Sequence, residues 1–138
     1  MVKSMAYENY LLKVGNYKIP GSMISAESYN VTKNGQDLDS YRDANGKLHR
    51  TALSHFVWKI EFDTIPMLTR TQINTLLKKI QENYTNTTEK KATVTFYDPE
   101  GDRYVTQEMY MPDIQFNIYG TYNNTIYYNS IRLAFIGY

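Results

Sequence analysis

The sequence predicts a mainly β protein with one flanking α-helix, built as an antiparallel β-sandwich or a partly closed barrel. Along most of the chain apolar residues alternate with polar ones, which is typical of strands with one buried face. One segment instead repeats at helical spacing, through Ile73, Leu76, Leu77 and Ile80. A single helix among strands favours a sheet with a helix laid against it over an enzyme core of alternating strands and helices.

The helix has its own start signal. Thr69 followed by Gln72 matches a capping box, in which each side chain satisfies the backbone N–H of the other residue. We therefore place the helix within 69–83. The stretch 83–91 that follows is rich in Thr, Asn and Lys and is predicted to be a polar loop.

The N-terminal part is predicted to contain two strands and an arm. The first strand spans 10–19, with one interruption, and the second spans 23–32. The polar segment 33–50 is predicted to be an exposed β-arm or a long loop. Within it, Asn45-Gly46 favours a tight hairpin turn with positive φ at both residues.

The clearest strand spans 53–65. Its core face is predicted to consist of residues that alternate with charged and polar ones, namely Phe56, Trp58, Ile60 and Phe62. We expect the opposite face of this strand to meet solvent or a second subunit.

Two hairpins complete the predicted sheet, and each consists of two strands around a short turn. They are formed by 92–97 and 103–111 around the acidic turn 98–102, and by 114–119 and 125–138 around the turn 120–124. The closing strand carries apolar residues on both faces at 131–136, so it is predicted to be covered on both sides.

Length and composition predict one domain over 1–138 and exclude several classes of site. The 15 basic and 14 acidic residues give a net charge of +1, so no overall field favours nucleic acid or an anionic membrane. The absence of cysteine excludes disulfides and thiolate sites and suits a reducing cytosol. No apolar run is long enough for a signal peptide or a membrane span, so we expect neither.

No group of residues predicts a metal site. The two histidines, His49 and His55, have no evident third ligand, so zinc is not expected. Asp98, Glu100 and Asp102 alternate as calcium ligands sometimes do, but they lack the closing glutamate of a calcium loop. A solvated acidic turn is predicted there instead.

Nucleic-acid binding and hydrolysis are also disfavoured. Basic residues gather near the end of the predicted helix beside aromatic residues that could stack on bases, at Lys78, Lys79, Lys90, Lys91, Tyr84 and Tyr97. Because a helix C-terminus attracts cations in any case, these lysines are predicted to be ordinary surface residues. A hydrolase would depend on carboxylates such as Asp98 or Glu61, and no motif supports one. We therefore predict no enzyme activity and no cofactor.

Tyrosine is the outlier of the composition, at 14 of 138 residues. Its ring offers a large rigid surface with a polar tip, and it is common both in strands and at protein interfaces. Any one tyrosine could fill a half-buried strand face, but their number points toward assembly.

Seven segments follow one another in an order known from a protein family: 14–20 (VGNYKIP), 43–47 (DANGK), 56–62 (FVWKIEF), 68–69 (LT), 94–101 (VTFYDPEG), 110–113 (YMPD) and 131–135 (IRLAF). In this order they resemble small tail proteins of phages and prophages of Gram-positive bacteria. The chain departs from that pattern by a longer N-terminal lead and by its tyrosine-rich end at 119–128.

The resemblance implies a tail-tube-like fold and a structural role in the virion tail, after assembly in the cytoplasm of the bacterial host. Such proteins form rings, commonly six-fold, around a channel that DNA traverses without specific binding. The implied partners are copies of the chain itself and neighbouring tail proteins, with no membrane. The implied role is a non-enzymatic distal tail or baseplate adaptor, and a tail-tube subunit of the same fold is the alternative.

Contacts between copies are expected where strand edges and loops stay uncovered in a monomer. The candidate interface residues are Asp43, Asn45 and Lys47 in the arm, and Tyr119, Tyr122, Tyr127 and Tyr128 near the end of the chain. A further alternative is a glycan-binding β-sandwich, in which Trp58 or the tyrosines of 119–128 would stack on sugar rings.

Overall fold

The structure is a computed structural model that describes residues 7–138, and of residues 36–39 and 51–55 it describes the backbone alone. In chain order its elements are β1 (Leu12–Val14), β2 (Tyr17–Lys18), the 3-10 helix η1 (Gly21–Met23), β3 (Asn30–Arg42), β4 (Leu48–Asp63), β5 (Leu68–Thr69), α1 (Arg70–Gln81), β6 (Tyr84–Asn86), β7 (Lys91–Asp98), β8 (Arg103–Tyr110), β9 (Ile118–Tyr122), β10 (Thr125–Tyr128) and β11 (Arg132–Gly137).

The named strands form two antiparallel sheets. In the larger sheet they follow the order β2-β1-β7-β8-β11-β4-β3, and β6 also pairs with β7. In the smaller sheet β10 lies between β5 and β9. Neither sheet closes into a barrel. The predicted mainly β, antiparallel fold with one helix is therefore confirmed, in an open form.

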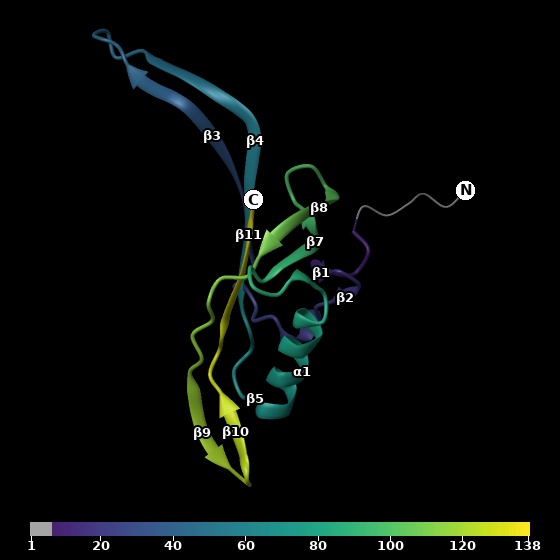
Figure 1. Cartoon of the computed structure of the whole chain (residues 1–138). Helices are drawn as coiled ribbons and strands as arrows, with labels where there is room; N and C mark the ends of the chain where they lie inside the picture. Colours follow the sequence, from purple (N-terminus) through teal and green to yellow (C-terminus); the bar gives the residue numbers. More distant parts are fainter. Residues whose placement is uncertain (1–6) are drawn as a thin grey trace.

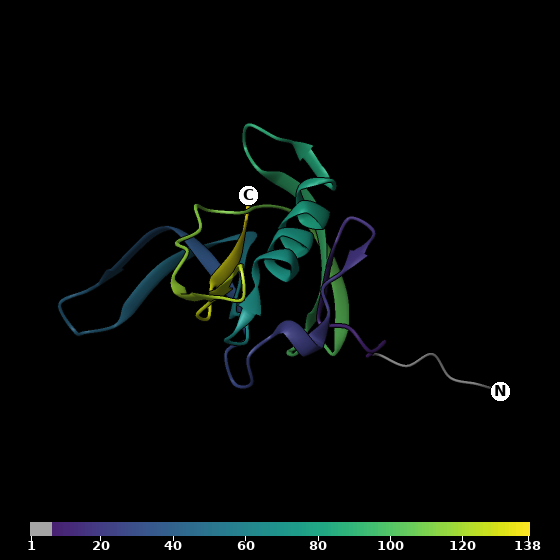
Figure 2. The same cartoon turned by 90° about the horizontal axis from the view of Figure 1, so that it is seen from below.

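The core lies between the larger sheet and α1, around which that sheet bends (Figure 2). The helix buries one face through Ile73, Leu76 and Ile80, each at most 2% exposed. Strand β7 faces this core with every second residue and alternates buried with half-buried positions along its whole length. The helical spacing of apolar residues in the sequence therefore corresponds to one buried helix face, and their alternation with polar residues corresponds to one buried sheet face.

Strand β4 contributes three of the four core residues predicted for it. Trp58, Ile60 and Phe62 are buried, whereas Phe56 is 40% exposed. Strand β11 pairs with β4 only from Lys59 onward, so Phe56 lies beyond the part of β4 that has neighbours on both sides.

The ends of α1 are fixed by side chains. The Thr69 hydroxyl accepts from the N–H of Gln72 (3.3 Å), and Gln72 Oε1 accepts from the N–H of Thr69 (2.9 Å), which is the predicted capping box. After the last turn, the side-chain amide of Asn83 donates to the carbonyl of Lys79 (2.9 Å). The polar stretch that follows is not wholly a loop, because β6 forms there and pairs with β7.

A long hairpin and a shorter one extend from opposite ends of the molecule (Figure 1). Strands β3 and β4 pair from Asn30 opposite Glu61 to Arg42 opposite Leu48, and the outer part of this ribbon, the arm, leaves the sheet. The β9–β10 hairpin points the other way. The molecule is therefore elongated, with the core between two projecting hairpins.

Several predicted strands differ from the structure. The segment 10–19 is a small hairpin, because β1 and β2 pair with each other around Gly15, whose φ is +58°. The segment 23–32 becomes a strand only at Asn30, since η1 and a turn occupy its first part. The segment 125–138 divides into β10 and β11, which belong to different sheets.

The closing strand β11 buries one face rather than two. Leu133 and Phe135 are each 1% exposed, and so is Ile131 just before the strand. On the other face Arg132 is exposed and Ile136 is half-buried. The predicted cover on both sides is therefore only partial on this second face, where Ile136 lines an open pocket together with Pro112 and Arg132.

Candidate assembly surfaces

One carboxylate organises the tip of the arm. Asp43 Oδ1 accepts hydrogen bonds from the backbone N–H groups of Asn45 (2.9 Å) and Lys47 (3.0 Å). Asp43 Oδ2 lies 2.9 Å from Nε2 of His49, whose ring stacks on Tyr41 with the centroids 5.0 Å apart. The bond to His49, followed by the two backbone bonds, lowers the pKa of Asp43 below its usual range.

The turn of the arm differs from the predicted one. Gly46 has a φ of +80°, and Asn45 does not share this left-handed conformation. The N–H of Gly46 donates to the carbonyl of Asp43 (2.9 Å), and the N–H of Asp43 donates to the carbonyl of Lys47 (2.9 Å). The connection therefore has three residues with a left-handed glycine last, instead of two residues that both have positive φ.

The sequence reasoning missed two large side chains near this tip. Tyr41 is 57% exposed and Leu48 is 43% exposed. They belong to neighbouring cross-strand pairs, Tyr41 with His49 and Arg42 with Leu48, so they lie on opposite faces of the ribbon. Their exposure could have been predicted from their positions on either side of the turn, because strand residues next to a projecting turn have no third strand to cover them.

At the opposite end, the β9–β10 hairpin carries a group of three tyrosines. The ring centroids of Tyr119 and Tyr122 are 6.4 Å apart, and those of Tyr122 and Tyr127 are 6.0 Å apart. Tyr119 and Tyr122 are each 54% exposed. The Tyr122 ring lies over Gly120, where a Cβ would come within 2.9 Å of a ring carbon. We call Tyr119, Tyr122 and Tyr127 the tyrosine face.

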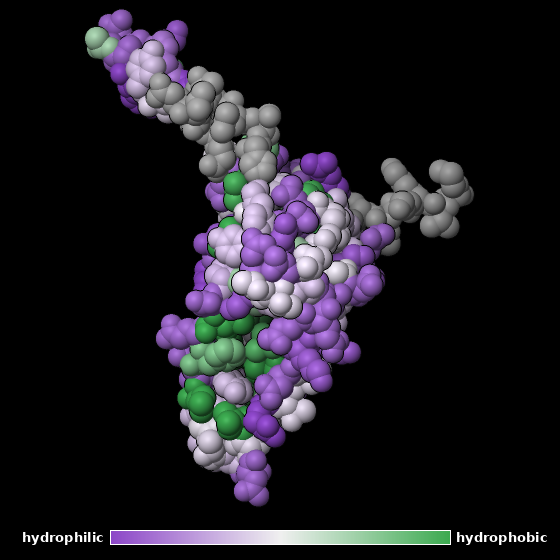
Figure 3. Space-filling view, in the orientation of Figure 1, coloured by the Kyte–Doolittle hydropathy of each residue, from purple (hydrophilic) through white to green (hydrophobic). Residues whose placement is uncertain are grey.

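Tyr128, the fourth tyrosine predicted here, has a different role. It packs against the core and faces Phe116, with the ring centroids 6.2 Å apart. Phe116 and Ile118, which the sequence reasoning missed, are 46% and 58% exposed. Hydrophobic side chains gather over this lower half of the molecule (Figure 3). The exposed apolar surface at this end therefore extends beyond the tyrosines and includes Phe116 and Ile118.

The turn of this hairpin is tighter than predicted. Only Asn123 and Asn124 separate β9 from β10, and both have positive φ, at +50° and +59°. Such a two-residue turn matches the right-handed twist of its strands. The left-handed asparagine pair is therefore found at this hairpin rather than in the arm.

The residue proposed for stacking on sugars is enclosed. Trp58 is 4% exposed and packs against Phe96, with ring centroids 5.0 Å apart. It cannot form a platform for a glycan. A glycan site on this chain would have to use the tyrosine face.

Among the residues whose side chains are described, no three potential ligands are grouped to hold a metal. His49 bonds to Asp43 in the arm, and the side chain of His55 lies outside the described ones. No described helix is long and apolar enough to cross a membrane.

The acidic turn is only partly solvated. Asp98 is 2% exposed, accepts from the N–H of Glu100 (3.0 Å) and lies 3.6 Å from Nε of Arg103. Asp102 accepts a hydrogen bond from the hydroxyl of Tyr97. The prediction of a fully solvated turn was wrong, because Asp98 stabilises the hairpin from within.

Three of the four lysines near the helix end, Lys79, Lys90 and Lys91, are paired with carboxylates. Contacts join Lys79 to Glu82 (4.0 Å), Lys90 to Asp113 (3.1 Å) and Lys91 to Glu108 (3.3 Å). The charge that would attract a phosphate backbone is therefore largely balanced within the chain.

The two carboxylates considered for hydrolysis are not neighbours. Asp98 is on β7 and Glu61 on β4, and β8 and β11 lie between these strands in the sheet. Glu61 is paired with Arg132 and with Lys59 (3.4 Å), and the bond to Arg132 is the main reason that its pKa is lowered. The arrangement provides no pair of carboxylates across a cleft.

Comparison with known proteins places the chain in a family. A family model described as a family of unknown function, DUF6711, matches residues 5–138. The chain belongs to DUF6711. No curated protein matches it.

One solved structure has a similar fold. It is described as the tail of an empty GTA particle, computed with helical refinement and C6 symmetry. The similarity covers 94% of this chain and 90% of that chain, with a TM-score of 0.53 and 14% sequence identity. At this identity the similarity concerns the fold.

Proposed function

We propose that this chain is a non-enzymatic structural subunit of a phage-like tail that assembles with its own copies into six-fold rings. The observation that carries the proposal is the placement of exposed apolar side chains on hairpins at opposite ends of one core. The match to a chain in a tail with C6 symmetry supports the same assembly. A heterologous contact between identical copies closes into a ring when its rotation allows.

Within this role, we favour a tail-tube subunit over the distal adaptor that the sequence favoured. The similar chain belongs to a structure described as a tail computed with helical refinement. In a helical assembly of identical copies, each contact repeats along the axis. A tube subunit needs matching surfaces above and below itself, and a hairpin at each end can supply them. An adaptor would instead use its two ends for different neighbouring tail proteins.

The contacts between copies are assigned to the two hairpins. In the arm they would use Asn45 and Lys47, which are exposed, together with Tyr41 and Leu48. Asp43 would hold the tip in shape for that contact, because its carboxylate is already bonded to the turn. DNA would pass through the ring without specific contacts, and assembly would take place in the cytoplasm of the host bacterium.

At the other end the contact would be the tyrosine face. The outer part of the arm has two strands, and the β9–β10 hairpin has only the two-residue strand β5 as a third. Such ribbons are marginally stable in water without further packing, so both hairpins should gain stability when a second copy covers them. Tyr119 and Tyr122 would supply large rigid contact area at small cost in side-chain entropy.

The test is the native mass of the purified chain by analytical ultracentrifugation, with negative-stain images of the same sample. Open-ended stacks are expected for a tube subunit and single closed rings for an adaptor. The double variant Tyr119→Ser/Tyr122→Ser should shift the material to monomer. Tyr7→Ser, at a site 40% exposed but outside the tyrosine face, is the matched control and should assemble normally.

A chain that stays monomeric at every concentration, even with neighbouring tail proteins added, would overturn the proposal. Binding of a host cell-wall polysaccharide by that monomer would then support the glycan-binding alternative, through the tyrosine face.

A further inference from the structure

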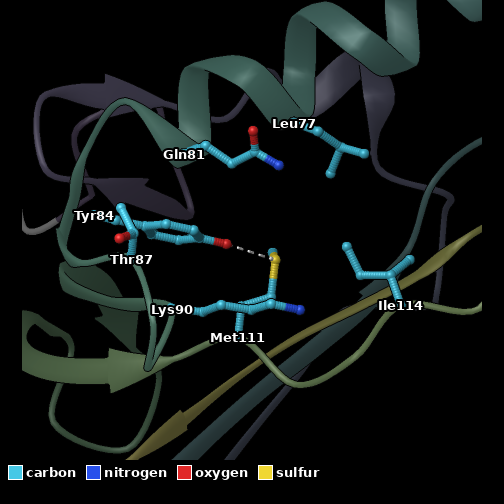
Figure 4. A pocket seen from close by; sticks show the side chains of 7 residues that line it. All are labelled: Leu77, Gln81, Tyr84, Thr87, Lys90, Met111 and Ile114. Carbon is cyan, nitrogen blue, oxygen red and sulfur yellow. Dashed lines mark hydrogen bonds between the residues drawn. The ribbon is translucent and has the colours of Figure 1, made fainter.

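A pocket lies between the end of α1, the loop that follows β6, and the segment that follows β8 (Figure 4). Its volume is about 280 Å³, which is close to the lower limit for small-molecule sites and suits a group the size of one amino acid. Leu77 on the helix, Met111 and Ile114 form its apolar walls. None of these residues belongs to the arm or to the tyrosine face.

Hydrogen-bond donors surround this apolar space. The side chains of Gln81 and Tyr84 point into it, and Thr87 and Lys90 line it on the side of the loop (Figure 4). The Tyr84 hydroxyl donates to the sulfur of Met111 at 3.6 Å, and a thioether is a weak acceptor. Burial raises the pKa of Tyr84, so this hydroxyl stays protonated and available as a donor.

Lys90 places a positive charge at the edge of the pocket. Its ammonium lies 3.1 Å from Oδ1 of Asp113, and the side chain of Asp113 is fully exposed to solvent. An exposed ion pair of this kind contributes little stability, so its carboxylate can be exchanged for another at small cost. The structure thus already shows a carboxylate on this ammonium, in a position that a ligand could take.

We propose that this pocket binds an apolar carboxylate, with its hydrocarbon part against Leu77, Met111 and Ile114 and its carboxylate on Lys90 in place of Asp113. The Tyr84 hydroxyl then gains an oxygen acceptor on the ligand. A free aliphatic acid and the carboxyl-terminal residue of a peptide present the same chemistry, and either can be the source. The proposal goes beyond ring assembly and does not depend on it.

The test is an NMR titration of the full chain that follows the methyl signals of Leu77, Met111 and Ile114. The probes are N-acetyl-leucine, its neutral amide, and the peptides Gly-Gly-Leu and Gly-Gly-Leu-amide. The acid should bind about tenfold more tightly than the amide, because one charge-assisted hydrogen bond is lost in the amide. Tight binding of Gly-Gly-Leu would identify a chain end as the source, and binding of the small acid alone would identify a free acid.

Two variants should move the affinity in opposite directions. Lys90→Met keeps the apolar stem but removes the charge, so the preference for acid over amide should disappear. Asp113→Asn removes the competing carboxylate, so the acid should bind about two- to threefold more tightly, as expected for loss of an exposed ion pair. Lys79→Met, a lysine on the helix surface outside the pocket, is the matched control and should leave both affinities unchanged.

Equal binding of acid and amide would overturn the proposal, as would titrations that leave the three methyl signals unmoved. For each variant, an unchanged NMR spectrum of the protein's backbone N–H groups would show that the protein is still folded. A change in affinity could then not be attributed to unfolding.

Discussion

Replacing Leu76 by alanine tests whether α1 is held by the buried face assigned to it. Leu76 is 1% exposed and lies in the core cluster between the helix and the sheet. Truncation removes three carbons from the core, worth roughly 2 kcal/mol in transfer free energy at about 0.8 kcal/mol per group. The cavity left behind adds to this, so the expected loss in the free energy of unfolding is about 3 to 4 kcal/mol.

Leu77→Ala is the matched control, because it makes the same chemical change one residue further along the helix. Leu77 is only half-buried: it packs against the margin of the core and lines the pocket, so its truncation should cost less, about 1 kcal/mol. The change in helix propensity is the same in both variants and cancels. Urea denaturation of the monomeric fraction, followed by circular dichroism, gives both values. Equal losses for the two variants would refute the assigned orientation of α1.

Two further outcomes are expected. Thr69→Ala removes the capping box and should lower the free energy of unfolding by about 1 kcal/mol. Thr71→Ala, at an exposed position in the same turn, is the control and should leave the free energy of unfolding unchanged. The midpoints of urea denaturation of the two variants measure this difference. Asp43 has a lower pKa in the folded arm than its ordinary 3.8, so its contacts stabilise the tip above that pH and are lost as pH falls through the folded value. The amide signals of Asn45 and Lys47 should therefore titrate with a midpoint below 3.8, and a midpoint at or above it would contradict the bonding described for Asp43.

The fold class was predictable because its signals are local. The spacing of Ile73, Leu76 and Ile80 records one buried helix face, and the capping box at Thr69 and Gln72 lies within four residues of chain. The division of 125–138 between two sheets was not predictable in this way. Each part is apolar enough to be a strand, and the choice of neighbour depends on β5 and β4, which are distant in sequence.

The candidate surfaces were predictable in place but not in detail. Composition indicated the tyrosine-rich end, yet it could not separate Tyr122, which is exposed, from Tyr128, which packs on the core. The two residues lie on opposite faces of the hairpin, because Tyr122 pairs with Thr125 and Tyr128 is an odd number of residues further along β10. The sequence alone does not show which of these two faces the core covers. Likewise, the acidic side chain of Asp98 was predicted to be solvated, but it is buried by its own turn and by Arg103.

The two projecting hairpins share one construction, and it links the fold to assembly. In the arm Phe56 lies opposite Gly35, with a ring atom 3.6 Å from where a Cβ of Gly35 would be; in the other hairpin Tyr122 covers Gly120. A glycine leaves backbone uncovered, and a large ring laid across it restores some of the lost packing. Because neither ribbon has a core beneath its outer part, the covering ring itself stays 40% exposed for Phe56 and 54% exposed for Tyr122. Such rings stabilise each hairpin enough to project from the core, and they leave at both ends an apolar surface that a second copy can bury.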